Sequence, residues 1–394
     1  MKINLAVIFG GKSVEHEVSV ISAVQAMASI NKEKYNIIPI YMTKGNEFYT
    51  GELLFDINSY KNIPELLKNC TECILVRSEG KVSLIRQKMK KFGSNIISDI
   101  DVAFPIVHGT NVEDGALQGY LQTLDIPYVG CDVLSSAVGM DKFTMKILLK
   151  DAGFPVLDCC RFSDFESENI SECIDKVEAK FSYPVIVKPV NLGSSVGISK
   201  ASDRRSLEKS IEEAFEFADT ILVEPAVVKL KEINCSVVGD CEEAEASVCE
   251  EPVQSDEILS YKDKYVSGDK SGGGSKGMAT LKRKIPAEIT PAQEEFIRKT
   301  AVEAFRYLKC GGVSRIDFMI DMETDKIYIN EINTIPGSLS FYLWEPKGVK
   351  YTELLDKLIN LSLKRYRKNS RISYSFDTNI LSMGGSFGAK GSKR

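Results

Sequence analysis

KINLAVIFGGKSVEHEVSVISAVQAM, residues 2–27, sets the architecture of the N-terminal region. The run before Gly10 and Gly11 is largely apolar, as in a buried strand. Ser13 suits the cap of a helix, and apolar side chains recur after it at helical spacing. A strand, a glycine turn and a helix in this order are typical of an α/β sheet.

The alternation of strands and helices continues beyond this unit. Further buried strands are predicted at residues 35–41 and 101–107. The less regular residues 45–98 are interpreted as an insertion with a hairpin that turns at Glu79-Gly80. We therefore predict an open, largely parallel sheet for the N-terminal region.

Two further units with mixed helices and strands follow. A helix is predicted from residue 140 to Gly153, where glycine suits the helix end. The predicted fold class is therefore α/β in the N-terminal region and α+β beyond it. The predicted boundaries are residues 1–133 for an N-terminal domain, 134–224 for a central unit, 225–366 for a C-terminal unit and 367–394 for a flexible tail.

The composition excludes several classes of protein. The 394 residues carry 50 basic and 55 acidic side chains, so a net charge of −5 offers no positive field for nucleic acid. The apolar run before Gly10 is too short to cross a membrane, which favours a cytoplasmic protein without a membrane partner. Ten scattered cysteines are expected to be reduced thiols. Only two histidines, His16 and His108, leave little scope for a zinc cluster.

A lysine and a glycine loop form the first candidate site. The predicted strand VIVK ends at Lys188, and NLGSSVG follows it. Gly193, Ser194 and Ser195 lie where backbone N–H groups can approach a phosphate closely. The pattern is neither a P-loop nor a dinucleotide fingerprint. It fits a nucleotide phosphate, and a plain surface turn also fits it.

The second candidate site is a hairpin that carries acidic residues. We predict a five-residue loop centred on Thr324, which pairs Asp321 with Ile327. This register places Asp317 directly opposite Glu331 on the neighbouring strand. Two carboxylates in such positions repel each other, so the hairpin calls for a cation between them.

The ends of the same strands add an arginine and an amide. Arg315 shares a face with Asp317, and Asn333 shares a face with Glu331, because each pair is two residues apart on a strand. Oxygen ligands from Asp, Glu and Asn favour Mg²⁺ or Mn²⁺. A surface hairpin in which Arg315 neutralises one acid is the alternative.

Two further features lie outside these motifs. Residues 241–257 carry seven acidic and no basic residues, whereas residues 261–285 carry seven basic residues and a run of glycines. A cationic, glycine-rich loop over residues 255–285 could close over polyphosphate, although a solvated loop fits equally well. Glu15 and His108 each follow a predicted strand of the first sheet and could therefore face one pocket.

Together these segments resemble the D-alanine–D-alanine ligases of the ATP-grasp superfamily over residues 1–365. The resemblance implies an ATP-grasp architecture, with the N-terminal α/β domain followed by two ATP-grasp α+β subdomains. It also implies that ATP phosphorylates the carboxylate of one D-alanine, and that the amine of a second D-alanine attacks the acyl phosphate. The motifs, in order, are FGGKSVEHEVS, HGTNVEDGALQGYLQTLDIPYVG, MDKFTMK, VKPVNLGSSVG, KEINCSVVG, SYKDKY, SRIDFMI and NEINTIPG.

The resemblance also implies a homodimer, which is usual for members of that family. It further implies roles for individual residues. The implied catalytic residues are Glu15, Ser194, Tyr265 and Arg315. Those implied to bind ATP are Lys142, Lys188, Ser195, Glu224, Glu232 and Lys264. Those implied to bind the amino-acid substrates are Glu15, His108, Arg315 and Gly337. Two Mg²⁺ or Mn²⁺ ions are implied at Asp317, Glu331 and Asn333.

The chain departs from the family pattern most clearly after Gly337, where the segment before Trp344 is shorter than usual. That segment helps to hold the second substrate, so the acceptor stays open between D-alanine, D-serine and another small D-amino acid or a peptide. Tyr265 after Lys264 matches peptide-forming members rather than those that join a hydroxy acid. A non-catalytic nucleotide-binding protein is the other class, against which the retained charged residues argue.

Overall fold

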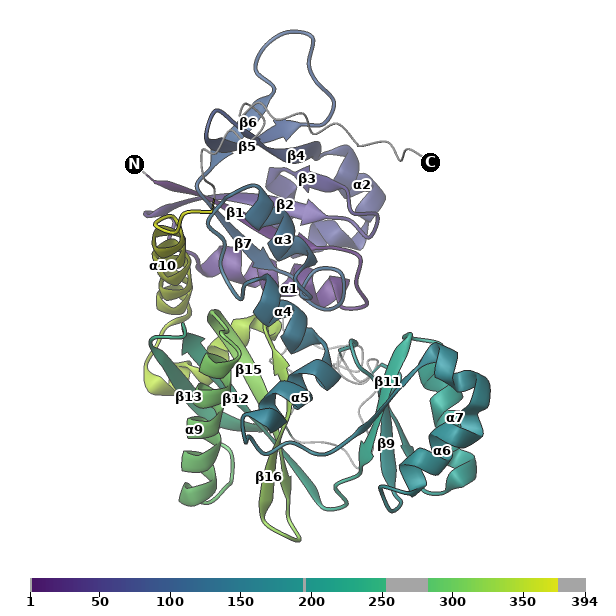
Figure 1. The fold of residues 1–394 in the computed structure, drawn as a ribbon. Coiled ribbons are helices and arrows are strands. Elements are labelled where there is room, and N and C mark those ends of the chain that lie inside the picture. Colours follow the sequence, from purple (N-terminus) through teal and green to yellow (C-terminus); the bar gives the residue numbers. More distant parts are fainter. Residues whose placement is uncertain (1, 194–195, 253–282, 375–394) are drawn as a thin grey trace, which may run out of the picture.

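The computed structural model describes residues 2–193, 196–252 and 283–374. Within these ranges the chain forms a seven-stranded, a four-stranded and a five-stranded sheet. Figure 1 shows the seven-stranded sheet at the top and the other two sheets below it. None of the helices in the described ranges is long and apolar enough to cross a membrane.

The predicted α/β unit forms one end of the seven-stranded sheet, whose strand order is β6-β5-β4-β3-β2-β1-β7. Strand β1 pairs in parallel with both β2 and β7, as expected. The side chains of β1 are almost all buried, which explains its continuous apolar sequence. The elements of this unit are β1 (Ile3–Gly10), α1 (His16–Ser29), β2 (Tyr35–Met42), β7 (Val102–Ile106) and α3 (Ala116–Thr123).

The predicted insertion, residues 45–98, lengthens the same sheet with antiparallel strands, so that the sheet as a whole is mixed. The hairpin turns at Glu79-Gly80 as predicted, and both residues have a positive φ. The elements of the insertion are β3 (Phe48–Thr50), α2 (Ile63–Lys68), β4 (Thr71–Ser78), β5 (Lys81–Arg86) and β6 (Ile96–Ile100).

Gly10 ends β1 in a conformation that glycine tolerates best. Its φ is +92°, and an added Cβ would lie 2.2 Å from the backbone oxygen of Met42. We expect Gly10→Ala to lower the free energy of unfolding by about 2–5 kcal/mol, because left-handed strain and a backbone clash add. Urea unfolding followed by circular dichroism measures this loss.

Gly80→Ala is the matched control for this change. Gly80 has a φ of +79° but nothing within 4 Å of an added Cβ. It should therefore show only the conformational cost, about 1–2 kcal/mol. Equal losses in the two variants would contradict the close approach at Gly10.

The four-stranded sheet has the order β10-β9-β11-β8, and its neighbours are antiparallel. Helices α6 and α7 cover one face, where their apolar side chains share a core with Val187 and Val223 (Figure 1). Because side chains alternate along a strand, Lys188 and Glu224 point to the opposite face. The elements are β8 (Cys160–Ser163), α6 (Ile170–Glu178), β9 (Val185–Pro189), β10 (Ser199–Ala201), α7 (Arg204–Phe215) and β11 (Thr220–Pro225).

The five-stranded sheet has the order β14-β13-β12-β15-β16. Helix α9 packs on it, and side chains of α4 and α5, such as Met145 and Leu149, enter the same core. These two helices precede the four-stranded sheet in sequence but pack with the five-stranded one. The elements are α4 (Val133–Met140), α5 (Lys142–Asp151), β12 (Leu230–Gly239), β13 (Ala244–Pro252), β14 (Arg283–Lys284), α9 (Pro291–Tyr307), β15 (Gly312–Asp321) and β16 (Lys326–Asn333).

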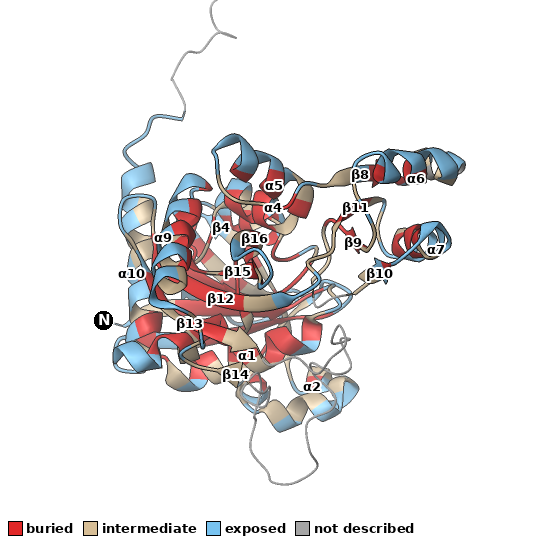
Figure 2. Ribbon diagram, turned by 90° about the horizontal axis from the view of Figure 1, so that it is seen from below, coloured by how far each residue is buried: buried red, intermediate tan, exposed pale blue. Residues whose placement is uncertain are grey.

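The chain then returns to the N-terminal core. Apolar residues of the 3-10 segment η5 (Gly337–Leu343) and of helix α10 (Tyr351–Asn369) share one core with the seven-stranded sheet. Trp344 is fully buried, and its Nε1–H donates to Ser236 Oγ of β12 at 3.1 Å. Figure 2 shows buried residues along β12 and on the inward sides of α6 and α7. The segment with Gly337 is therefore held between the first and last sheets.

Candidate active site

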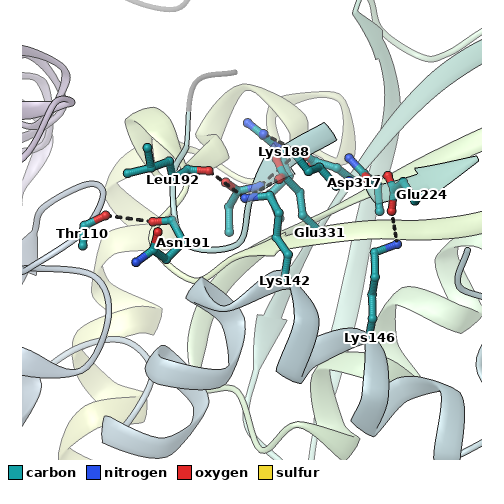
Figure 3. Close-up of polar contacts among 12 residues, drawn as sticks. Thr110, Lys142, Lys146, Lys188, Asn191, Leu192, Glu224, Asp317 and Glu331 are labelled. Carbon is teal, nitrogen blue, oxygen red and sulfur yellow. Dashed lines mark hydrogen bonds and ion pairs between the residues drawn. The ribbon is translucent and has the colours of Figure 1, made fainter. Parts of the chain in front are cut away.

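The first lysine of the site lies at the start of α5. Asp141 caps this helix by accepting the N–H of Thr144 at 2.7 Å. The buried ammonium of Lys142 lies 3.3 Å from Glu331 Oε2 and donates to the Leu192 carbonyl at 2.7 Å (Figure 3). Lys142 therefore connects the acidic hairpin to the loop that follows Lys188.

The second lysine, Lys188, is buried near the end of β9. Its Nζ lies 2.5 Å from Glu224 Oε1 of β11 and 3.2 Å from Asn330 Oδ1 of β16. Burial opposes ionisation of Glu224, but Lys188 and Lys146 outweigh it and hold the pKa of this carboxyl below its usual value. Glu224 is therefore charged and paired with cations from two elements.

The hairpin β15–β16 presents the predicted charged residues on one face. Asp317 pairs with Glu331, and Arg315 pairs with Asn333, as predicted. Arg315 donates to Asp317 through two bonds, from Nε at 2.7 Å and from Nη2 at 2.6 Å. Asn333 Nδ2 donates to the same carboxylate at 3.0 Å. Arg315 thus neutralises one acid of the pair, as in the alternative interpretation, although both side chains are largely buried and not at the surface.

The predicted loop register is wrong by one residue. Asp321 pairs with Lys326, not with Ile327, and Ile320 pairs with Ile327. A bulge compensates, because Phe318 pairs with Ile329 while Asp317 pairs with Glu331. The extra residue is Asn330, and its side chain bonds Lys188. The predicted facing of Asp317 and Glu331 is therefore confirmed through a different register at the turn.

Asp317 is electrostatically unusual. Burial raises the pKa of its carboxyl to about 6, Arg315 opposes this rise, and the neighbouring Glu331 adds to it. Two facing carboxylates and an amide are a donor set that fits a hard divalent cation. Among the described residues no group of three or more His, Cys, Asp or Glu side chains is placed to hold a metal ion. The third oxygen donor of this candidate set would therefore be the amide of Asn333, whose Nδ2 donates to Asp317.

Glu15 lies where the first and second units meet. An added Cβ on Gly193 would lie 2.6 Å from Glu15 Oε2, and one on Gly109 would lie 3.0 Å from the same atom. Thr110 Oγ1 donates to the Asn191 carbonyl at 2.8 Å, which ties the two loops together (Figure 3). The two glycines leave room for the carboxylate between the loops.

His108 uses both of its ring nitrogens within the fold. Its Nδ1 lies 2.8 Å from the Ile335 carbonyl, and its Nε2 lies 3.0 Å from Ser22 Oγ. Burial lowers the pKa of His108, although the Glu15 carboxylate opposes the shift. A carbonyl only accepts, so Nδ1 carries the proton and Nε2 accepts from Ser22. Ser22 Oγ in turn accepts the N–H of Ser338, next to Gly337, at 3.0 Å.

The segment after Gly337 has an unusual backbone. Ser338, Leu339 and Ser340 all have φ values of 50–52°. Left-handed conformations at non-glycine residues cost about 1–2 kcal/mol each. Such strain persists where surrounding contacts fix the backbone, and it is concentrated at functional sites. Here the Ser22 hydroxyl and the fully buried Leu339 side chain provide those contacts.

Comparisons with known proteins give a consistent result. A family model described as D-ala D-ala ligase N-terminus matches residues 4–131, and one described as D-ala D-ala ligase C-terminus matches residues 148–360. The chain belongs to the D-alanine–D-alanine ligase family. It is therefore an ATP-dependent ligase with the ATP-grasp architecture.

Individual relatives of the ligase match nearly the whole chain. This chain is 38% identical to the D-alanine–D-alanine ligase of Thermosipho melanesiensis, over 96% of this chain and 98% of the relative. It is 41% identical to that of Acetivibrio thermocellus, over 93% of this chain and 98% of the relative.

Solved structures agree with these relatives. The D-alanine–D-alanine ligase of Coxiella burnetii superposes with a TM-score of 0.75 at 28% identity, covering 94% of this chain and 96% of that one. The VanG D-Ala:D-Ser ligase of Enterococcus faecalis has a TM-score of 0.75 at 33% identity, covering 92% and 100%. The Bacillus anthracis enzyme complexed with ATP has a TM-score of 0.65 at 25% identity, covering 93% and 99%.

The ligase brings most of the predicted site residues together. Glu232 lies on β12 opposite Met319, so it shares a sheet face with Asp317, which lies opposite Asn234. Glu224 is buried, and its carboxylate lies between Lys146 and Lys188. The predictions for Ser194, Ser195, Lys264 and Tyr265, and for residues 255–282 of the predicted loop, lie outside the described residues. The end of that loop, Arg283–Lys284, forms strand β14 and pairs with β13.

Sequence reasoning missed three residues of the site, namely Lys146, Asn330 and Glu113. Lys146 lies one helical turn after Lys142, a spacing that could have revealed it. Glu113 is buried and accepts the N–H of Gly109 at 3.0 Å and the N–H of Ile335 at 2.7 Å. It therefore fastens the loop after His108 to the segment before Gly337.

Glu113 also gives the ligase a pH-dependent stability. Burial raises the pKa of its carboxyl to about 7, from an ordinary value of 4.5. Between these values the folded chain keeps a proton that the unfolded chain has lost. The stabilisation that the protonated carboxyl of Glu113 gives the fold is complete below pH 4.5 and is lost as the pH rises through 7. The free energy of unfolding falls by at most about 3 kcal/mol over this range.

Glu113→Gln should lack this decline. We expect the free energy of unfolding of the wild type, measured relative to the variant, to fall between pH 4.5 and 7.5. Urea unfolding at several pH values measures the difference, in which the other titrating groups cancel. Parallel pH curves for the two proteins would show that the carboxyl of Glu113 ionises normally.

Proposed function

We propose that the protein joins two D-alanine molecules into a dipeptide at the expense of ATP, as its family membership supports. The carboxylate of the first D-alanine attacks the γ-phosphorus, and ADP leaves. The amine of the second D-alanine then attacks the carbonyl carbon of the acyl phosphate. The bond from that carbon to the phosphate oxygen breaks, phosphate leaves and the amine loses a proton.

One observation carries this proposal. Buried Lys142 and Lys188 converge on the acidic hairpin, where Asp317 faces Glu331 and Arg315 lies beside them. Phosphoryl transfer needs positioning and charge neutralisation more than it needs a covalent nucleophile. Cations from α5 and β9 opposite carboxylates from β15 and β16 supply both.

The oxygen donors Asp317, Glu331 and Asn333 are proposed to hold two Mg²⁺ or Mn²⁺ ions. Divalent ions at this place would neutralise charge on the phosphates. Lys142 and Lys188 would bind the nucleotide phosphates, and Glu224 and Glu232 would mark the adenine and ribose end. Arg315 would stabilise the oxyanion that forms when the amine adds.

The N-terminal loops are proposed to hold the amino acids. Glu15, between two glycine loops, would take the ammonium group of the first D-alanine. His108 would act on the substrate through Ser22, which accepts the N–H of Ser338 beside Gly337. The N–H of Gly337 would meet the carboxylate of the second D-alanine. Ser194 and Tyr265 are proposed to close the site by hydrogen bonds to Glu15.

The wider setting of the reaction is also part of the proposal. Residues 1–133 would bind the first substrate, residues 134–224 the nucleotide, and residues 225–366 the metal ions, with the loop 255–285 over the phosphates. The protein would act in the cytoplasm as a homodimer, as its relatives usually do. The dipeptide would serve as a peptidoglycan precursor, as the family implies.

Product analysis tests the proposal. Purified protein is incubated with ATP, Mg²⁺ and either D-alanine, L-alanine, D-serine or D-lactate, and phosphate release and product mass are measured. Release that depends on D-alanine, with a dipeptide product, is expected. A mixed product from D-alanine and D-serine would show that D-serine is the acceptor. Phosphate release that none of the D-amino acids stimulates would reject the substrate class.

A further inference from the structure

Three charged side chains meet in the interior between α5 and the four-stranded sheet. Glu224 Oε1 lies 2.5 Å from Lys188 Nζ, and Glu224 Oε2 lies 2.9 Å from Lys146 Nζ. All three side chains are at least 95% buried, and Figure 3 shows Lys146 reaching up to Glu224 from α5. One carboxylate thus lies between two ammonium groups, and the cluster has a net charge of +1.

The two lysines are not equivalent. Lys188 also meets Asn330, next to the proposed metal ligand Glu331. Lys146 Nζ forms only an ion pair, with no partner in hydrogen-bond geometry among the described residues. Burial lowers the pKa of Lys146, and Glu224 counteracts this shift. Burying an ammonium group in this way is costly, so its presence calls for a reason beyond packing.

Charge arithmetic supplies that reason. Without Lys146, the carboxylate of Glu224 would cancel the charge of Lys188, and the pair would present no net charge to a phosphate. With Lys146 present, two ammonium groups contact the one carboxylate of Glu224, so one positive charge remains. In a low-dielectric interior this difference weighs more than it would in water.

We propose that Lys146 is a positioning residue that neutralises Glu224, so that the cluster around Lys188 presents one net positive charge to a nucleotide phosphate. The inference rests on the proposed function, because it assigns the phosphate to Lys188. It adds a residue whose proposed role is exerted through Glu224 and not through direct contact with a phosphate.

The helix explains how one element serves both parts of the site. Lys142 and Lys146 are four residues apart and therefore project from the same face of α5. The first reaches Glu331 of the five-stranded sheet, and the second reaches Glu224 of the four-stranded sheet. Met145 and Leu149 anchor the helix in the core of the five-stranded sheet. Helix α5 therefore fixes a cation against an acid of each sheet.

The test compares the affinities of the full-length protein for ATP and for adenosine by calorimetry. Adenosine lacks phosphates, so the ratio of the two affinities isolates the phosphate term. We expect Lys146→Met to lower ATP affinity about tenfold relative to adenosine, as expected for the loss of one nearby charge. Lys146→Arg should restore the ratio to within about threefold of the wild type.

The double variant Lys146→Met with Glu224→Gln separates charge balance from structure. It leaves Lys188 as the one charge of the cluster, so the ratio should return toward the wild-type value even if ATP and adenosine both bind more weakly. It leaves the Lys188 ammonium without a buried counter-charge, whereas Lys146→Met alone keeps the Glu224–Lys188 ion pair. Lys146→Gln, which also removes the charge of Lys146, keeps the test available if Lys146→Met does not fold. A ratio that stays low in the double variant would overturn the proposal.

Lys150→Met is the matched control, since Lys150 lies one turn further on α5 and pairs with Asp158 at 3.1 Å near the surface. It should change neither affinity. An unchanged ratio in Lys146→Met, or an equal loss of ATP and adenosine affinity, would contradict the inference. Binding of ATP is measured without amino acids, so a failed dipeptide assay with the wild type would reject the proposed function separately.

Discussion

Replacement of Glu331 by glutamine is expected to lower kcat by at least about a hundredfold, the scale typical for loss of a charged group that orders reacting phosphates. Glu331 faces Asp317 across the hairpin, and its Oε2 lies 3.3 Å from Lys142 Nζ. Glutamine keeps the shape of the side chain but removes its charge. Phosphate release at saturating ATP, D-alanine and Mg²⁺ measures the effect.

The stability of this variant distinguishes a functional from a structural loss. Glu331 repels Asp317 and contributes to the raised pKa of that carboxyl. The variant loses the ion pair with Lys142, but it also loses the repulsion of Asp317, and the two effects offset each other. The Tm of the metal-free variant should therefore stay within about 2 °C of the wild-type value. Glu323→Gln, in the exposed turn of the same hairpin, is the control and should retain full activity. A kcat within threefold of the wild type would remove Glu331 from the metal site.

The hairpin also shows how far sequence reasoning extends. The i, i+2 spacing of Arg315 and Asp317 sets their shared face regardless of the turn, so their position was predictable. The turn register was not, because the bulge at Asn330 depends on a contact with Lys188 from another sheet. The two errors, in the loop and in the bulge, cancel at Asp317 and Glu331.

Residues that act through distant partners escaped prediction for a similar reason. Glu113 lies in a quoted motif, but its role depends on Ile335, 222 positions away in the sequence. His108 was expected to face the substrate, whereas its bonds lead to the backbone around Gly337. The short-range pattern revealed the strands, the hairpins and the charged residues. Which of those residues contact each other is set by the packing of three sheets, which no local spacing encodes.

Replacement of Arg315 by alanine is expected to lower kcat about a hundredfold or more while leaving ATP affinity within threefold of the wild type. The charge that Arg315 would stabilise develops only when the amine adds to the acyl phosphate, so ground-state binding of ATP should not change. Arg298→Ala, on the surface of α9, is the matched control and should behave as the wild type.

The fork between Arg315 and Asp317 offers a second explanation for such a loss. Arg315 donates two hydrogen bonds to Asp317 and counteracts the rise in its pKa. Without Arg315 the carboxylate would hold its proton to a higher pH and bind a cation less well. A loss of this second kind would be repaired by excess Mg²⁺ and by higher pH, whereas loss of oxyanion stabilisation would persist under both conditions. We therefore expect the kcat of Arg315→Ala to stay low at saturating Mg²⁺ and at pH 9. Recovery to near the wild-type value would show that Arg315 serves Asp317 and not the transition state.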